Sequence, residues 1–252
     1  MTTLFISDVH VDAAQPAITR RLLQFLEGEA RTARALYILG DLFESWIGDD
    51  AADPDQQQVI AALRTLTDTG TTCFVLHGNR DFLLGPGFSE ASGAQLLPDP
   101  LLLTLYGKQV LVMHGDALCT DDVSYQRLRA TVRDADWQRR FRSLSLPARR
   151  TLASAARAGS QDHTAGLEYK IADANQDSVA TVLRAAGVNT LLHGHTHRPA
   201  IHRFTLDGRE CTRIVLGDWY TQGSVLRWDE RGYELAGLTD SASVTASAGV
   251  PE

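Results

Sequence analysis

The chain has 252 residues, 31 of them acidic and 24 basic, with a formal net charge of −7 at pH 7. This length can form one large α/β domain with an ample core, and the negative charge argues against nucleic acid as a partner. The three cysteines are widely spaced, so we expect reduced, buried thiols in a cytosolic protein. No window approaches the ~20 apolar residues of a membrane span, and we expect no signal peptide ahead of the first strand.

Short apolar runs that end in Asp, Asn or His recur along the chain. These runs cover residues 4–6, 36–39, 73–76, 110–113 and 190–192. Between the first three, residues 17–33 and 59–66 carry apolar side chains at helical spacing. Runs this short and rich in β-forming residues predict strands of a sheet buried on both faces, and their alternation with helices predicts a parallel α/β core.

The second half of the chain contains a long stretch without strand patterns. Residues 125–132, 137–144 and 147–158 have helical spacing, whereas a hairpin is expected at 101–113 and antiparallel strands at 203–206, 211–216 and 224–228. We therefore predict a core at 1–122 and 171–238 with a helical insertion at 123–170. Residues 239–252 are small and polar without periodicity, which predicts a disordered tail.

Five short motifs carry the polar residues that follow these strands. They are Asp8-Val9-His10, Gly40-Asp41, Gly78-Asn79-Arg80-Asp81, His114-Gly115-Asp116 and Gly194-His195-Thr196-His197. One such residue alone is more often a structural cap than a ligand, but five at successive strand ends predict a common site. The ligand set suits Mn, Fe or Zn and consists of Asp8, His10, Asp41, Asn79, His114, His195 and His197. His77 and His193 precede candidate ligands, and we expect both to serve in packing or support because side chains alternate along a strand.

The ordered set of motifs resembles the calcineurin-like metallophosphoesterase superfamily. The strings at 38–50 and 118–122, together with Arg80, are similar to the UDP-2,3-diacylglucosamine pyrophosphohydrolases of lipid A biosynthesis. This resemblance implies an α/β sandwich of mixed sheets flanked by helices, with the insertion at 123–170 acting as a cap. It also implies hydrolysis of the pyrophosphate bond of UDP-2,3-diacylglucosamine to UMP and 2,3-diacylglucosamine 1-phosphate (lipid X).

The resemblance also implies a cofactor and a location. Two divalent ions, expected to be Mn²⁺, would share Asp41. The first ion would be held by Asp8, His10, Asp41 and His197, and the second by Asp41, Asn79, His114 and His195. The protein would work as a monomer in the cytoplasm, peripherally bound at the anionic inner face of the inner membrane. Because histidine ligands must be neutral, activity should fall at acidic pH.

Arg80 is the informative position of the third motif, because many members of the superfamily have His there. Arginine cannot donate a proton near neutral pH, but it can clamp a phosphate through two parallel hydrogen bonds. The catalytic residues expected by resemblance are Asn79, Arg80 and His195. Asp81 either orients Arg80 or forms a turn, and the two interpretations are left open.

The resemblance implies substrate contacts from the core and from the insertion. The residues that it carries over are Asn79, Arg80, Asp122, Ser160, Thr164 and His195. Related enzymes often have Lys at the position of Leu167, and Lys170 is a candidate replacement, so both positions are in doubt. Glu44 and Trp46 are read as supporting residues without assigned chemistry.

The insertion is the basic part of an acidic protein. From 123 to 165 the chain has nine arginines and three aspartates, a net charge of +6. One interpretation is a solvated helical surface; the other is a cap whose arginines meet phosphate or an anionic membrane. In the second, the apolar surface would come from Trp137, Phe141, Leu144 and Leu146.

Two other functions fit parts of the pattern. A phosphatase or dinucleoside polyphosphate hydrolase of the same superfamily would need neither Arg80 nor a basic, partly apolar insertion. A non-catalytic metal-binding scaffold would be expected to lose ligands, whereas this chain retains all seven.

Overall fold

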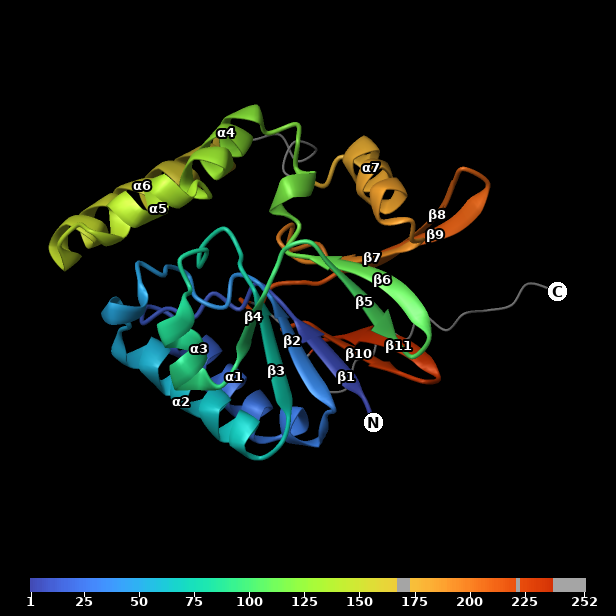
Figure 1. Cartoon of the computed structure of the whole chain (residues 1–252), viewed down its shortest axis with the longest axis horizontal. Coiled ribbons are helices and arrows are strands. Elements are labelled where there is room, and N and C mark those ends of the chain that lie inside the picture. The colour runs from blue at the N-terminus through green and yellow to red at the C-terminus, as the bar shows by residue number, and fades with distance from the viewer. Residues whose placement is uncertain (167–172, 221–222, 238–252) are drawn as a thin grey trace.

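Two β-sheets form the centre of the molecule (Figure 1). The computed structural model describes the backbone of residues 1–166, 173–220 and 223–237, and the side chains of these ranges except 160–166. The six-stranded sheet has the order β11-β10-β1-β2-β3-β4, and the five-stranded sheet has the order β5-β6-β7-β9-β8. The prediction of an α/β sandwich of mixed sheets is confirmed.

The six-stranded sheet combines a parallel part with an antiparallel edge. Its strands are β1 (Thr3–Ile6), β2 (Ala35–Leu39), β3 (Thr72–Leu76), β4 (Gln95–Leu97), β10 (Val225–Asp229) and β11 (Gly232–Ala236). β1 to β4 pair in parallel, whereas β10 pairs antiparallel with both β1 and β11.

The five-stranded sheet is mixed in the same way. Its strands are β5 (Leu101–Leu105), β6 (Lys108–Met113), β7 (Thr190–His193), β8 (Ala200–Leu206) and β9 (Arg209–Val215). β6, β7 and β9 are parallel, and the edge strands β5 and β8 are antiparallel to their neighbours. The five predicted strands therefore exist but belong to two sheets instead of one, because a buried apolar run does not reveal its pairing partner.

Four layers result from this arrangement. Helices α1 (Pro16–Glu27), α2 (Pro54–Asp68) and α3 (Pro86–Ser92) cover the outer face of the six-stranded sheet, and α7 (Gln176–Ala186) covers the other sheet (Figure 1). Side chains such as Phe5, Val112 and Ile214 fill the space between the sheets. Each strand near the centre is thus buried on both faces, as its composition predicts.

Local sequence explains where several helices begin and end. Asp53 and Gln56 form a reciprocal capping box at the start of α2, and Pro54 occupies the first helical position. The helix predicted over 17–33 instead ends at Glu27, because Gly28 has a non-helical backbone and a short 3-10 helix (Glu29–Thr32) follows. α3, β4 and α7 were not predicted; α3 and β4 are too short to show a period.

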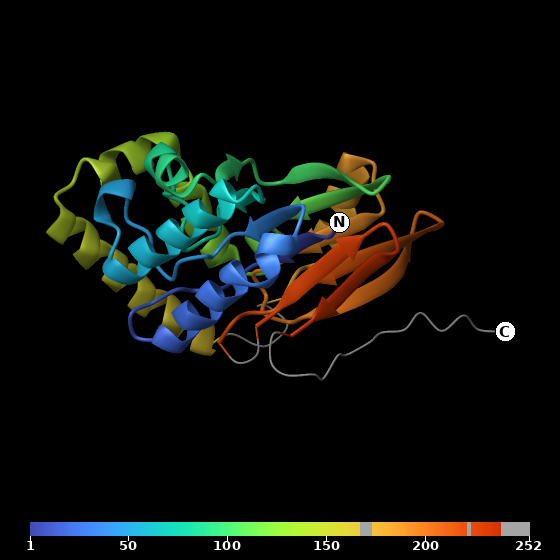
Figure 2. The same cartoon turned by 90° about the horizontal axis from the view of Figure 1, so that it is seen from below.

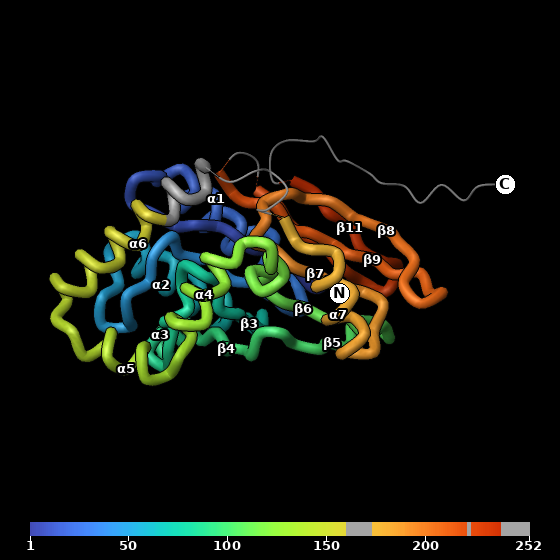
Figure 3. Tube along the Cα trace, turned by 90° about the horizontal axis from the view of Figure 1, so that it is seen from above, coloured from blue at the N-terminus to red at the C-terminus, as the bar shows by residue number. Residues whose placement is uncertain are grey.

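Three helices occupy the stretch after β6 in which helical spacing was predicted. α4 (Val123–Val132), α5 (Ala135–Arg142) and α6 (Leu146–Gly166) form an elongated arm over the end of the six-stranded sheet (Figures 1 and 3). Seen from below, the arm lies at the same end of the molecule as α1 to α3, away from the β8–β9 hairpin (Figure 2). Among the described residues, no helix has both the length and the apolar character needed to cross a bilayer.

The cysteines behave as predicted. Cys73, Cys119 and Cys211 are buried and unpaired. The tail predicted from 239 onward lies outside the described residues.

Candidate active site

The predicted ligands follow the carboxyl ends of β1, β2, β3, β6 and β7. Five of the seven have a left-handed backbone, with φ between 53° and 67°. They are Asp8, His10, Asp41, His195 and His197. Residues other than glycine rarely adopt this conformation, and such strain persists where the surrounding structure fixes a functional geometry.

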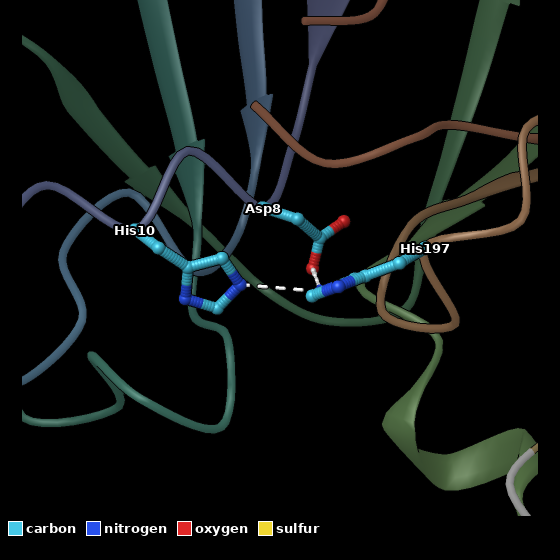
Figure 4. Close-up of side chains that lie close together, drawn as sticks. All are labelled: Asp8, His10 and His197. Atoms are coloured by element: carbon cyan, nitrogen blue, oxygen red, sulfur yellow. Dashed lines mark hydrogen bonds and ion pairs between the residues drawn. The ribbon is translucent and has the colours of Figure 1, made fainter. Parts of the chain in front are cut away.

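The first cluster contains Asp8, His10 and His197, whose ligand atoms lie within 4.8 Å of one another (Figure 4). His197 Nε2 is 3.2 Å from His10 Nε2 and 3.4 Å from Asp8 Oδ1. Spacings of 3 to 4 Å are those expected of atoms that each lie about 2 Å from one common ion. The cluster therefore has the geometry of a metal site.

The second cluster contains Asp41, His114 and His195, and Asn79 joins it. Asn79 Oδ1 lies 2.9 Å from His114 Nε2 and 2.8 Å from His195 Nδ1. The amide oxygen and the two ring nitrogens thus converge on one point. Asn79 carries no charge and is therefore not an obvious metal ligand, but the sequence motif identified it.

Asp41 belongs to the second cluster and also faces the first. Its Oδ2 is 3.9 Å from His10 Nε2 in the first cluster and 3.8 Å from His114 Nε2 in the second. Its Oδ1 accepts a hydrogen bond from the backbone N–H of Arg80 at 2.8 Å. One oxygen is therefore held in place while the other faces both clusters, as a bridging ligand requires.

The remaining atoms of the histidines are oriented by neighbours. His114 Nδ1 lies 2.8 Å from the carbonyl oxygen of Leu39, and His10 Nδ1 lies 2.8 Å from Glu44 Oε2. Such contacts fix the ring orientation and leave the other nitrogen available to an ion. Asp8 shows the same pattern, because Oδ2 accepts from the backbone N–H of His195 at 2.9 Å while the buried Oδ1 has no hydrogen-bond partner among the described residues. The donor set therefore fits two divalent ions.

The acidic surroundings make this site sensitive to protons. Burial by itself would lower the pKa of His114, but the carboxylates of Asp41, Asp116 and Asp8 together raise it to about 9. A ligand histidine must be neutral, so a metal ion competes with a proton here and binds more weakly as the pH falls.

Asp81 has a different role from the orientation of Arg80. Its buried carboxylate accepts hydrogen bonds from the backbone N–H groups of Gly78 and Leu42, both at 2.8 Å, and of Asp41 at 3.3 Å. The loops after β2 and β3 are joined through this one side chain. A Cβ at Gly78 would lie 2.0 Å from Asp41 Oδ1, so the approach of the two loops requires glycine there.

A calcineurin-like phosphoesterase family model matches residues 1–199. The chain belongs to the calcineurin-like phosphoesterase family. The chain is also similar to three curated proteins, each named UDP-2,3-diacylglucosamine hydrolase. One from Stenotrophomonas maltophilia is 50% identical over 95% of this chain and 99% of that protein. Those from Pseudomonas entomophila and Escherichia coli O81 are 50% and 48% identical, over 92% and 93% of this chain and 97% and 98% of those proteins.

Glu44 is a residue of this phosphoesterase whose importance the sequence did not show. Its carboxylate contacts His10, and it also lies 3.1 Å from both Arg157 Nε and the Tyr220 hydroxyl and 3.9 Å from an Arg80 nitrogen. Burial would raise the pKa of Glu44, but His10 and the arginines lower it to about 2. Its position three residues after Asp41 was the available signal.

Ion pairs attach the insertion to the core of the phosphoesterase. Arg149 donates two hydrogen bonds to Asp50, at 2.8 and 2.5 Å, and a third to the carbonyl oxygen of Ile47. Arg157 donates to Asp12 at 2.7 Å. These arginines are engaged with protein groups, so only part of the predicted positive charge faces outward.

The aromatic residues of α5 also face inward, which corrects one expectation. Phe141 is buried in the core cluster, and Trp137 packs against it and lies near Phe82. Among the described side chains of the insertion, the exposed large apolar ones are Val123, Leu128, Leu144 and Leu152, and of these only Leu144 was predicted. Leu146 is half-buried.

The substrate contacts expected by resemblance remain predictions. Asp122 caps the N-terminus of α4, where its side chain accepts from the backbone N–H of Tyr125 at 2.9 Å. Ser160 and Thr164 belong to α6, but their side chains are not described, and Leu167 and Lys170 lie outside the described residues.

Proposed function

We propose that this phosphoesterase hydrolyses UDP-2,3-diacylglucosamine to UMP and 2,3-diacylglucosamine 1-phosphate with two Mn²⁺ ions. The observation that carries the proposal is the pair of donor clusters with Asp41 between them. The curated relatives named for this substrate support it, since each covers more than nine tenths of the chain.

The proposed ligands divide as the geometry suggests. Asp8, His10 and His197 would hold one ion, Asn79, His114 and His195 the other, and Asp41 both. When bound, two divalent ions supply a nucleophile at neutral pH and stabilise the charge that develops at phosphorus. The protein then has to orient the substrate and neutralise its remaining charge.

Arg80 is suited to that second task. Its backbone N–H holds Asp41, so its side chain begins beside the proposed bridging ligand. A guanidinium clamps phosphate but cannot protonate a leaving group. A pyrophosphate suits such a site, because its leaving phosphate needs little protonation, whereas an alkoxide would need a proton donor.

The reaction can be tested directly by isotope labelling. The purified protein with Mn²⁺ should convert UDP-2,3-diacylglucosamine in water enriched in heavy oxygen, and mass analysis of both products locates the label. Label in UMP is expected, which corresponds to attack at the α-phosphorus. The absence of any hydrolysis, with bis(p-nitrophenyl) phosphate cleaved normally, would contradict the proposed substrate.

Substitution of Arg80 separates clamping from proton donation. Arg80→Lys keeps the charge but loses the fork, and Arg80→Ala loses both, so turnover should fall in that order with metal content unchanged. Loss of a charge-assisted hydrogen-bond pair corresponds to a decrease of about tenfold to a hundredfold. A variant with Arg80→His that matched the wild-type rate would show that proton donation limits the reaction instead.

We further propose that the protein binds peripherally, as a monomer, to the cytoplasmic face of the inner membrane through the insertion. The exposed Leu128 of α4 and Leu152 of α6 offer apolar surface, and α5 ends in the exposed Arg139, Arg140 and Arg142. Apolar side chains beside basic ones are typical of surfaces that bind anionic lipid.

Charge reversal on α5 tests this membrane surface. Replacing Arg139, Arg140 and Arg142 with Glu should reduce binding to vesicles of anionic phospholipid, because each basic residue near such a surface contributes ~1 kcal/mol. Activity on the lipid substrate should fall with binding, while cleavage of bis(p-nitrophenyl) phosphate changes little.

A matched control uses three exposed arginines elsewhere, Arg20, Arg31 and Arg34, replaced with Glu. This variant has the same net charge, so it should retain vesicle binding if the location of the charge matters. Equal losses of vesicle binding in the two triple variants would show that only the net charge matters and that α5 is not the binding surface.

A further inference from the structure

Asp116 is a buried carboxylate that lies two residues after the proposed ligand His114. Its side chain is fully buried, and the sequence motifs indicated no function for it. Asp116 Oδ2 accepts hydrogen bonds from the Tyr125 hydroxyl at 2.9 Å and from Arg129 Nε at 2.8 Å, and an Arg133 nitrogen lies 3.7 Å away. These donors recur every four residues, so one face of α4 and its C-terminal cap is turned toward this carboxylate.

The same face of α4 contacts the loops that carry two proposed ligands. Gln126 donates to the backbone carbonyl oxygen of Asp116 at 2.8 Å, and Arg133 donates to that of Gly78 at 3.0 Å, next to Asn79. The ring of Tyr125 stacks on the ring of His195, with centroids 5.9 Å apart and an interplanar angle of 27°.

A buried carboxylate needs hydrogen-bond donors or positive charges close to it, so the contact between Asp116 and α4 favours one position of the helix. Asp116 is shielded from solvent, and its Oδ2 is bound by the Tyr125 hydroxyl and by Arg129 of α4, whereas its Oδ1 has no hydrogen-bond partner among the described residues. Displacement of α4 would remove both side-chain donors from this buried carboxylate. The helix therefore has one preferred position relative to His114. This position also determines where the exposed Leu128 and the N-cap residue Asp122 lie.

We propose that Asp116 is a positioning residue that fixes α4 to the metal-binding loops, so that the acylated part of the substrate is held at a set distance from the ions. The proposal rests on the proposed function, because it concerns how that substrate is placed. The effect of Asp116 is transmitted through Tyr125 and Arg129.

Kinetics on two substrates can separate positioning from general support. Asp116→Asn should raise KM for UDP-2,3-diacylglucosamine by about tenfold or more, as expected for a lost charge-assisted hydrogen bond, with a smaller change in kcat. The effect on kcat/KM for bis(p-nitrophenyl) phosphate should be several times smaller. Arg129→Leu should change KM in the same direction as Asp116→Asn, and the effects in the double variant should be clearly less than additive, because both substitutions disrupt the Asp116–Arg129 contact.

Hydrogen exchange supplies a readout that does not depend on activity. In Asp116→Asn, amide exchange in α4 should accelerate by about tenfold or more, while exchange in β6 and metal content change little. Arg129→Lys keeps the charge and should restore part of the protection that Arg129→Leu removes. Asp207→Asn is the control, because it breaks an exposed pair with Arg184 far from α4 and should alter none of these quantities.

The outcomes distinguish the two proposals. Failure of the wild-type protein to hydrolyse the lipid nucleotide would refute the proposed function. Unchanged exchange in α4, or equal losses on both substrates together with loss of metal, would overturn the positioning role of Asp116 even in an active enzyme.

Discussion

Asp41→Ala should reduce turnover by several orders of magnitude while the fold largely survives. Its Oδ2 lies between the two donor clusters, 3.9 Å from His10 Nε2 and 3.8 Å from His114 Nε2, so both proposed ions would lose a ligand at once. The same change removes the acceptor for the Arg80 backbone N–H, which frees the loop that carries Arg80. Activity measured together with metal content decides the prediction.

Two further variants show whether the effect of Asp41→Ala comes from the lost charge and from its location in the site. Asp41→Asn keeps an oxygen for the Arg80 N–H but lowers the negative charge, so it should retain more metal than Asp41→Ala. Asp68→Ala removes an exposed carboxylate that pairs with Arg64 at 3.3 Å, on the surface of α2, and should leave both quantities unchanged. Near-wild-type activity in Asp41→Ala would refute the shared two-metal site.

The candidate ligands could be predicted because the ends of the strands can be recognised in the sequence. An apolar run followed by Asp, Asn or His marks both the strand and the edge at which its loop emerges, and parallel strands bring such loops together. The allocation of β6 and β7 to a second sheet was not predictable in the same way, since pairing depends on contacts between distant segments.

The roles of the insertion's arginines could not be read from their number. Arg149 and Arg157 carry the same charge as the exposed Arg140, yet they are bound to Asp50 and Asp12 in the core. Which arginine is paired depends on how the helices lie against loops whose partner residues are 99 and 145 positions away in the sequence. The net charge of the insertion therefore overestimates its exposed positive surface.

Supporting residues are the hardest to recognise, because their partners are either backbone atoms or side chains distant in the sequence. Glu44 could be placed in the correct loop but not assigned to His10. Asp81 was interpreted as orienting Arg80 or forming a turn, whereas its carboxylate joins two loops through their backbone N–H groups. A side chain that accepts from backbone N–H groups leaves no partner residue in the sequence to identify it.

Asp81→Ala should be among the most destabilising substitutions near the site. The carboxylate accepts from the buried N–H groups of Gly78, Leu42 and Asp41, and the N–H of Phe43 lies 3.4 Å away. Each buried donor left without a partner costs ~1–3 kcal/mol, so the sum is several kcal/mol and a large part of a typical stability. Because these donors belong to the loops of Asp41 and Asn79, metal affinity should fall as well.

Denaturant unfolding with and without Mn²⁺ measures both effects of this change. The midpoint of Asp81→Ala should lie well below that of the wild type, and added Mn²⁺ should raise it by less than it raises the wild-type midpoint, because the ligand loops are loosened. Asp81→Asn retains one acceptor oxygen but turns an N–H₂ group toward N–H donors, so it should recover only part of the loss. Asp53→Ala, which removes a capping contact at α2 and no contact to a proposed ligand, should lower stability with a full response to Mn²⁺. An Asp81→Ala protein with wild-type stability and metal response would mean that the two loops hold their positions without this carboxylate.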